Sequence, residues 1–183
     1  MLKKVPITRK FADLPAFEAL YKTAFPTGEQ APLWLLYARA KKPNVAFDAY
    51  YDGEIFAGFT YVLTHKDITF VLYLAIDAQY RSKGYGSQIL TYIREGHPNN
   101  RIVLTIELLD ENAKNNPQRI KRKQFYLKNG YVESGFRVTT IGVDYELLCL
   151  GGRCAAQEFL TINRKFIGLA LSLFVKTRIT EME

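Results

Sequence analysis

A strand, a glycine-containing loop and a helix follow one another in the middle of the chain, and this unit constrains the fold more than any other segment. Residues 70–76 (FVLYLAI) are apolar apart from one tyrosine, which is typical of a strand in a sheet that is covered on both faces. The loop 81–86 follows, and Ile89, Leu90 and Ile93 then recur at helical spacing. Such a unit is typical of an α/β fold.

A second apolar segment, 102–108, comes after this helix and is expected to lie parallel to the first strand through a right-handed connection. Apolar spacing and turn residues predict further helices at 11–24, 32–40, 117–129 and 155–175, and further strands at 45–51, 55–64, 131–140 and 143–150. Because no repeat or low-complexity linker interrupts the chain, we expect residues 1–183 to form one domain. Its fold class is α/β (α+β, mixed sheet), with a central mixed β-sheet flanked by helices.

The charge balance of the 183 residues favours an anionic partner. Lys+Arg number 25 and Asp+Glu number 18, a net charge of +7, which indicates a nucleic acid, a membrane surface or a phosphorylated ligand. The two cysteines, Cys149 and Cys154, lack CxxC spacing, so neither a disulfide framework nor a metal site is predicted. The amino terminus lacks an apolar signal sequence, and the apolar run 166–175 is too short to span a bilayer. We therefore expect a cytoplasmic protein without a membrane span.

The loop Arg81-Ser82-Lys83-Gly84-Tyr85-Gly86 has the composition of an anion-binding turn. It lies where a helix begins, and the unpaired amides and positive dipole end of a helix N-terminus attract phosphate. Glycines at 84 and 86 allow a phosphate to approach the main chain closely, while Arg81 and Lys83 add positive charge. The chain has no GxxxxGK[ST] sequence, so the loop is not a Walker A loop, and it is not a complete dinucleotide fingerprint because position 89 is Ile instead of a third glycine. A tight strand-to-helix turn without a ligand is the alternative.

Two signatures in this order resemble those of the GNAT superfamily of N-acetyltransferases. The first, Arg/Gln-x-x-Gly-x-Gly/Ala after a buried strand, is matched by Arg81, Gly84 and Gly86. The second, an aromatic-tyrosine pair followed by glycine and an aromatic residue, is matched in the segment 125–131 (FYLKNGY). The resemblance covers about residues 70–135 and implies the GNAT-like acyl-CoA N-acyltransferase fold, here with an extra C-terminal helix. It also implies acetyl-CoA as co-substrate and an amine acceptor, either a small molecule or a peptide.

The resemblance further assigns residues to the binding of CoA. Main-chain groups of Leu74, Ala75 and Ile76 would hold the pantetheine arm like an added strand and supply the amides that stabilise the oxyanion. The pyrophosphate loop would comprise Arg81, Ser82, Lys83, Gly84, Tyr85, Gly86 and Ser87.

The helix predicted over 117–129 is basic, and three of its side chains lie along one side. Arg119, Arg122 and Tyr126 fall at positions i, i+3 and i+7, so the stripe is about 10 Å long. A phosphate of CoA could bind at its start while the thioester lies near Tyr126. Many family members have an asparagine where this chain has Arg119, and we expect Asn112 and Asn116 to substitute for it. A solvated charged face is the alternative.

Three side chains are candidates for catalysis. Tyr126 is the candidate general acid, because a phenol with a pKa of about 10 can give a proton to the departing thiolate; a core tyrosine is the alternative. Glu107, near the end of a buried strand, is the first candidate base, acting directly or through water, with a salt bridge as the alternative. Glu29 is the second candidate, since the family often builds its acceptor pocket from that region.

Two other functional classes stay open at this stage. One is a non-catalytic acyl-CoA sensor of the same fold. The other is a basic protein that binds single-stranded nucleic acid, but the cations gather on one helix and one loop rather than among aromatic residues on strands, so no nucleic-acid partner is expected. The apolar C-terminal segment is predicted to pack on the sheet or to close the acceptor side, with a membrane surface or a homodimer interface as alternatives.

Overall fold

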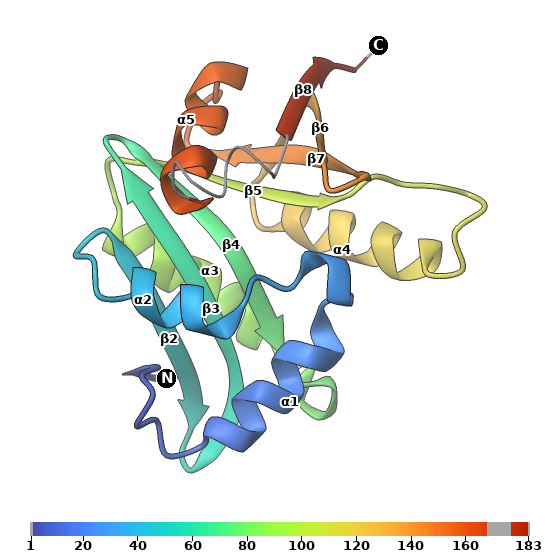
Figure 1. Cartoon of the computed structure of the whole chain (residues 1–183). Helices are drawn as coiled ribbons and strands as arrows, with labels where there is room; N and C mark the ends of the chain where they lie inside the picture. Colours follow the sequence, from blue (N-terminus) through green and yellow to red (C-terminus); the bar gives the residue numbers. More distant parts are fainter. Residues whose placement is uncertain (1, 168–176, 183) are drawn as a thin grey trace. The chain divides into compact units, whose positions relative to one another are not determined.

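The computed structural model describes residues 2–167 and 177–182, which form one mixed sheet with helices (Figure 1). The order of the eight strands is β1-β2-β3-β4-β5-β7-β6-β8. The chain divides into two compact units, Met1–Thr64 with Val71–Pro98, and His65–Phe70 with Asn99–Glu183. The mixed α/β class predicted from the sequence is confirmed. Among the described residues, no helix combines the length and the apolar character that crossing a membrane requires.

The first unit contains the elements from β1 to α3, except His65 at the end of β3 and residues 68–70 of β4, which belong to the second unit. In chain order they are β1 (Lys3–Pro6), α1 (Leu14–Ala24), η1 (Thr27–Glu29), α2 (Leu33–Arg39), β2 (Val45–Asp52), β3 (Ile55–His65), β4 (Ile68–Ile76), η2 (Ala78–Tyr80) and α3 (Tyr85–Gly96). Strands β1 and β2 are antiparallel, as are β2 and β3. The helix expected over 11–24 begins only at Leu14, with Pro15 in its first turn, where a proline loses no intrahelical hydrogen bond.

Aromatic side chains form the core of this unit. Phe17 of α1 lies edge-on to Phe59 of β3, with 4.9 Å between the ring centroids, and to Phe47 of β2 at 5.3 Å. Edge-to-face pairs at such distances stabilise a core beyond the burial of their area. Helix α1 is therefore held on strands β2 and β3 through the apolar stripe that its sequence predicts.

The second unit contains the remaining elements: β5 (Arg101–Glu107), α4 (Asn116–Lys128), β6 (Val132–Thr140), β7 (Val143–Leu150), α5 (Ala156–Ile167) and β8 (Thr177–Glu181). The first residues of β4 pair in parallel with β5, from Ile68 opposite Arg101 to Phe70 opposite Val103, as predicted. Strand β7 pairs with both β5 and β6. The predicted C-terminal helix is present over Ala156–Ile167, and residues 168–176 of that prediction lie outside the described residues.

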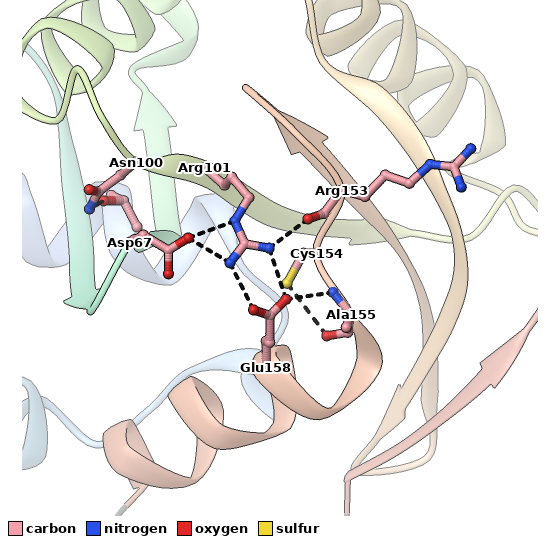
Figure 2. Close-up of polar contacts among 8 residues, drawn as sticks. Asp67, Asn100, Arg101, Arg153, Cys154, Ala155 and Glu158 are labelled. Carbon is pink, nitrogen blue, oxygen red and sulfur yellow. Dashed lines mark hydrogen bonds and ion pairs between the residues drawn. The ribbon is translucent and has the colours of Figure 1, made fainter.

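Arg101 at the start of β5 joins three parts of the second unit (Figure 2). Its guanidinium donates to the carboxylate of Asp67 at 2.7 and 3.0 Å and to the carbonyl of Arg153 at 2.7 Å. It also donates to both carboxylate oxygens of Glu158 in α5, at 2.8 and 2.9 Å. Glu158 in turn accepts the main-chain N–H of Ala155, which precedes the helix. One arginine thus fixes the turn before β4 and the beginning of α5.

Glu158 is expected to stabilise the fold at neutral pH and to lose this effect in acid. Its hydrogen bonds to Arg101 lower its pKa from 4.5 to about 2. A carboxyl with a depressed pKa contributes stability above its unfolded pKa and loses it as the pH falls through the folded value. Because the side chain is 39% exposed, we expect a contribution of about 1 kcal/mol. Urea unfolding of wild type and Glu158→Gln should differ by this amount near neutral pH and converge toward about pH 2; a difference that is independent of pH would contradict the assignment.

Candidate active site

The residues predicted from the sequence to bind CoA or to catalyse fall in both units. The first unit contains Glu29, the strand residues Leu74, Ala75 and Ile76, and the loop residues Arg81, Ser82, Lys83, Gly84, Tyr85, Gly86 and Ser87. The second unit contains Glu107, Asn112, Asn116, Arg119, Arg122 and Tyr126.

The glycine loop has the backbone of an anion-binding turn. Gly84 caps α3 in the left-handed conformation, with φ = +82°, and a Cβ added there would meet no atom within 4 Å. The backbone angle therefore favours glycine, while the space beside it stays open. The first hydrogen bond of α3 runs from the N–H of Gln88 to the carbonyl of Gly84 at 3.1 Å. The amides of the three preceding residues have no partner within the helix and can bind an anion.

Two hydrogen bonds and one cation–π contact hold the side chains of this loop. Arg81 donates from Nε to the carbonyl of Ile76 at 3.2 Å, which turns its guanidinium toward the end of β4 and leaves its terminal nitrogens available. Lys83 lies over the ring of Tyr80, with 5.1 Å from Nζ to the centroid. The Tyr85 hydroxyl donates to Asp52 at 2.6 Å. Two cations thus accompany the amides of the turn.

The strand residues predicted to hold the pantetheine arm lie where the main chains of β3 and β4 pack closely. A Cβ at Gly58 of β3 would lie 2.2 Å from the carbonyl oxygen of Ala75. Only glycine permits this approach without a shift of the backbone. Gly58 was not among the residues predicted from the sequence, although an isolated glycine within a strand pattern is a recognised signal of such an approach.

Two buried tyrosines anchor the segment that contains Glu29. The Tyr73 hydroxyl donates to the carbonyl of Glu29 at 2.7 Å and accepts the N–H of Ala31 at 2.9 Å. The Tyr21 hydroxyl lies 2.9 Å from the carbonyl of Ala31 and 3.2 Å from the Tyr73 hydroxyl. Burial raises the pKa of both phenols, so both remain neutral. Sequence analysis missed this role, because Tyr21 and Tyr73 occupy ordinary apolar positions in a helix and a strand.

Glu107 is the centre of a charged cluster in the second unit. One carboxylate oxygen lies 3.1 Å from a guanidinium nitrogen of Arg119, and the other lies 2.8 Å from Arg122. Asn115 donates to the same carboxylate at 3.2 Å and accepts from Nε of Arg119 at 3.0 Å. The side chain of Glu107 is only 8% exposed. The salt bridge that the sequence left open for Glu107 is therefore present, and its role as a base stays a prediction.

Of the two asparagines predicted to substitute in CoA binding, Asn112 lies between β5 and α4, and Asn116 is the first residue of α4. Asn116 accepts the N–H of Asp110 through its side-chain oxygen at 3.1 Å, and the main-chain N–H of Asn112 donates to the Asp110 carboxylate at 3.0 Å. Both residues therefore brace this loop, and their contact with CoA stays a prediction. Asn115, which was not predicted, holds both Glu107 and Arg119 from the N-cap position of α4. An asparagine next to a helix start was the signal that could have identified it.

Tyr126 combines a buried ring with a hydroxyl that makes no hydrogen bond to the described part of the chain. The residue is 8% exposed, and its ring lies edge-on to Phe125 at 5.0 Å and to Tyr131 at 5.5 Å. Burial raises the pKa of Tyr126 to about 12, although the positive charge of Arg122 opposes the shift. The phenol is therefore protonated throughout the neutral range and can donate a proton.

Comparison with known proteins decides the family. The model of the acetyltransferase (GNAT) domain matches residues 43–133, about half of the chain. The chain belongs to the GNAT acetyltransferase family. The matched residues include the glycine loop, Glu107 and Tyr126, whereas Glu29 lies before them. No relative was found among curated protein sequences.

Solved structures show that the GNAT fold extends beyond this match. A GNAT-family protein from Bacteroides thetaiotaomicron is 20% identical, with a TM-score of 0.71 over 92% of this chain and 98% of its own. The ribosomal-protein-S18-alanine N-acetyltransferase of Escherichia coli is 18% identical, with a TM-score of 0.60 over 86% and 97%. A GNAT acetyltransferase from Elizabethkingia anophelis with acetyl-CoA bound is 12% identical, with a TM-score of 0.57 over 81% and 97%. The GNAT fold predicted from the sequence is confirmed.

Replacement of Glu107 by glutamine is expected to destabilise this GNAT protein by about 2 kcal/mol. Removing the carboxylate leaves two guanidinium groups without their shared counter-ion, and breaking a buried pair costs several kcal/mol; the partial exposure of Arg122, 38%, reduces the effect. The matched control is Glu133→Gln, because Glu133 is 51% exposed and its partner Lys123 also pairs with Glu146. The control should lose less than about 1 kcal/mol in urea unfolding. Equal losses in the two variants would show that the cluster is not a stabilising centre.

Proposed function

We propose that this GNAT protein transfers an acetyl group from acetyl-CoA to an amine, which attacks the thioester directly without a covalent enzyme intermediate. The observation that carries the proposal is Tyr126, a buried and neutral phenol whose hydroxyl has no hydrogen-bond partner among the described residues. A neutral phenol can give its proton to a ligand atom that accepts it. In the reaction, that atom would be the sulfur of the departing CoA thiolate.

The glycine loop is the proposed site for the pyrophosphate of CoA. The amides of Tyr85, Gly86 and Ser87 begin α3, and Arg81 and Lys83 add charge beside them. A helix N-terminus of this kind binds phosphate through both its unpaired N–H groups and its dipole. The Elizabethkingia anophelis protein, whose structure contains acetyl-CoA, supports this choice of co-substrate.

Main-chain amides of residues 74–76 are proposed to hold the pantetheine arm and to stabilise the oxyanion that forms when the amine attacks the thioester carbonyl. Amides fixed in a strand can donate to this charge without reorganising during the reaction. The main chain of Gly58 packs closely against Ala75 in this part of β4.

We assign the general base to Glu29 in preference to Glu107. Both oxygens of Glu107 already face guanidinium groups, which occupy its lone pairs. Glu29 is half-buried in a segment whose main chain is fixed by Tyr73. A fixed main chain limits the positions that this carboxylate can take, as removal of a proton from an ammonium acceptor requires.

The proposed acceptor is an amine of a small molecule or a peptide. The acceptor of the Escherichia coli neighbour is an alanine of ribosomal protein S18, which supports a peptide amine as one arm of a screen. The other arm is a panel of small amines, including polyamines and amino sugars.

The test combines ligand binding with turnover. Acetyl-CoA should raise the melting temperature of the protein, because a ligand that binds only the native state stabilises it. At least one amine in the panel should then release free CoA, measured with a thiol reagent, at a rate above that without an acceptor. Stabilisation by acetyl-CoA with no turnover on any amine would favour the sensor. No stabilisation by acetyl-CoA, with salt-dependent binding of an oligonucleotide, would favour the nucleic-acid binder.

A further inference from the structure

A cavity of about 660 Å³ lies in the first unit, apart from every residue assigned above to acetyl transfer. It is bounded by the segment after β1, the end of α2 and the beginning of β2, and we call it the basic groove. Its lining includes the cations Lys4, Arg9, Lys10 and Lys41 and the aromatic rings of Tyr37 and Phe47. Cavities of this volume are typical of sites for small molecules.

Positive charge dominates the rim of the basic groove. Four cations line it, against the single carboxylate of Asp48. That carboxylate is already paired with Lys4 at 3.4 Å. Among residues 2–167 and 177–182, Arg9, Lys10 and Lys41 form no ion pair with an acidic group. The groove therefore presents three uncompensated cations to a ligand.

The wall of the basic groove is apolar and aromatic. Ile7 and Phe47 are 2% and 4% exposed, and the ring of Tyr37 lies 5.9 Å from that of Phe47. The Tyr37 hydroxyl is buried and has no hydrogen-bond partner in the described part of the chain. Burial and the charge of Glu18 raise the pKa of this phenol, and the charge of Arg9 opposes the shift. A ligand that complements this wall and the cations beside it would have a flat apolar body and an oxygen acceptor.

We propose that the basic groove binds a small aromatic carboxylate. The carboxylate would pair with the guanidinium of Arg9, whose planar fork suits two parallel hydrogen bonds, and Lys10 and Lys41 would add to the attraction. The ring would lie against Tyr37 and Phe47, where aromatic pairs gain energy beyond their buried area. Because none of these residues belongs to the proposed acetyl-transfer site, the inference does not depend on the proposed function.

The test uses three probes and isothermal titration of the full chain. The probes are 2-naphthoate, its neutral analogue 2-naphthamide, and inorganic phosphate, which has charge without an aromatic body. We expect 2-naphthoate to bind at least tenfold more tightly than either of the others, since the groove supplies both charge and apolar surface. Chemical shifts of the Tyr37 and Phe47 ring protons should change on binding, and saturating CoA should not displace the probe.

Two double variants distinguish binding in the groove from general attraction to the basic surface. Arg9→Glu with Lys41→Glu should weaken 2-naphthoate binding by about tenfold or more, because two attractions become repulsions. The control is Arg94→Glu with Lys128→Glu, which changes the net charge equally at two exposed positions outside the groove. Equal losses in the two double variants would overturn the proposal. It would also be overturned if 2-naphthoate failed to bind, if 2-naphthamide or phosphate bound equally well, or if CoA displaced the probe.

Discussion

The Tyr126→Phe variant is expected to transfer acetyl groups about 10²- to 10⁴-fold more slowly than wild type, the range typical of a lost general acid. The thiolate would then leave without a proton from the protein. Because the hydroxyl makes no hydrogen bond to the described residues, its removal should leave the melting temperature and the affinity for acetyl-CoA nearly unchanged. The measurement is kcat from CoA release, with the dissociation constant of acetyl-CoA determined separately.

Tyr131→Phe is the matched control for this substitution. Tyr131 is also buried, lies 5.5 Å from Tyr126 between ring centroids, and has a hydroxyl without a hydrogen-bond partner among the described residues. Its activity should stay within a few-fold of wild type. Similar rate losses in the two variants, or full activity of Tyr126→Phe, would refute the role of Tyr126 as the acid.

The raised pKa of Tyr126 adds a prediction for the pH profile of the same reaction. Since burial holds this pKa at about 12, the phenol keeps its proton well above the range in which an exposed tyrosine ionises. The rate should therefore rise with pH as the amine loses its proton and should not fall between about pH 9 and 10. A decline in that range that is absent from Tyr126→Phe would show that the phenol ionises earlier than its burial implies.

Gly84→Asp is expected to weaken the binding of CoA by about 100-fold, because it would place a carboxylate beside the proposed pyrophosphate site. A Cβ at Gly84 meets no atom within 4 Å, so the new side chain fits sterically. The backbone angle of +82° is unfavourable for most residues, but aspartate and asparagine tolerate it better than the others.

Gly84→Asn is the control, since it matches aspartate in size and backbone preference but has no charge. It should lose less than about tenfold in affinity, and both variants should unfold at similar urea concentrations. The difference between their dissociation constants for CoA, measured by titration calorimetry at low salt, isolates the electrostatic effect. If aspartate and asparagine bind CoA equally well, the turn at Gly84 is not the pyrophosphate site.

Elements with strong local signals were predictable from the sequence. Strand β4 has a nearly continuous apolar run, and α4 has Pro117 at its start and Gly130 beyond its end, so its bounds differ from the prediction by one residue. Strands β1 and β8 were missed, because each is short and polar and is held by main-chain pairing with its neighbour. Main-chain hydrogen bonds with a distant segment leave no periodic pattern in the sequence.

Some residues of the candidate site were likewise predictable from local sequence, and others were not. Arg81, Gly84 and Tyr126 occur in local motifs, and the amino acids around them are enough to suggest phosphate binding and proton donation. The pairing of Glu107 with Arg119 and Arg122 joins a strand to a helix 12 and 15 residues later. Sequence reasoning recognised the carboxylate and the two cations but left their partnership open.

Local order along the chain was thus sufficient for the fold class, the glycine turn and the family, because turns, caps and apolar spacing act over a few residues. The tertiary structure alone decided that Tyr73 holds the segment of Glu29, that Glu107 is shared by two arginines, and that a basic groove lies between the ends of β1 and α2. These features depend on which side chains meet across distant segments, and that is set by the packing of the core rather than by any neighbouring residue.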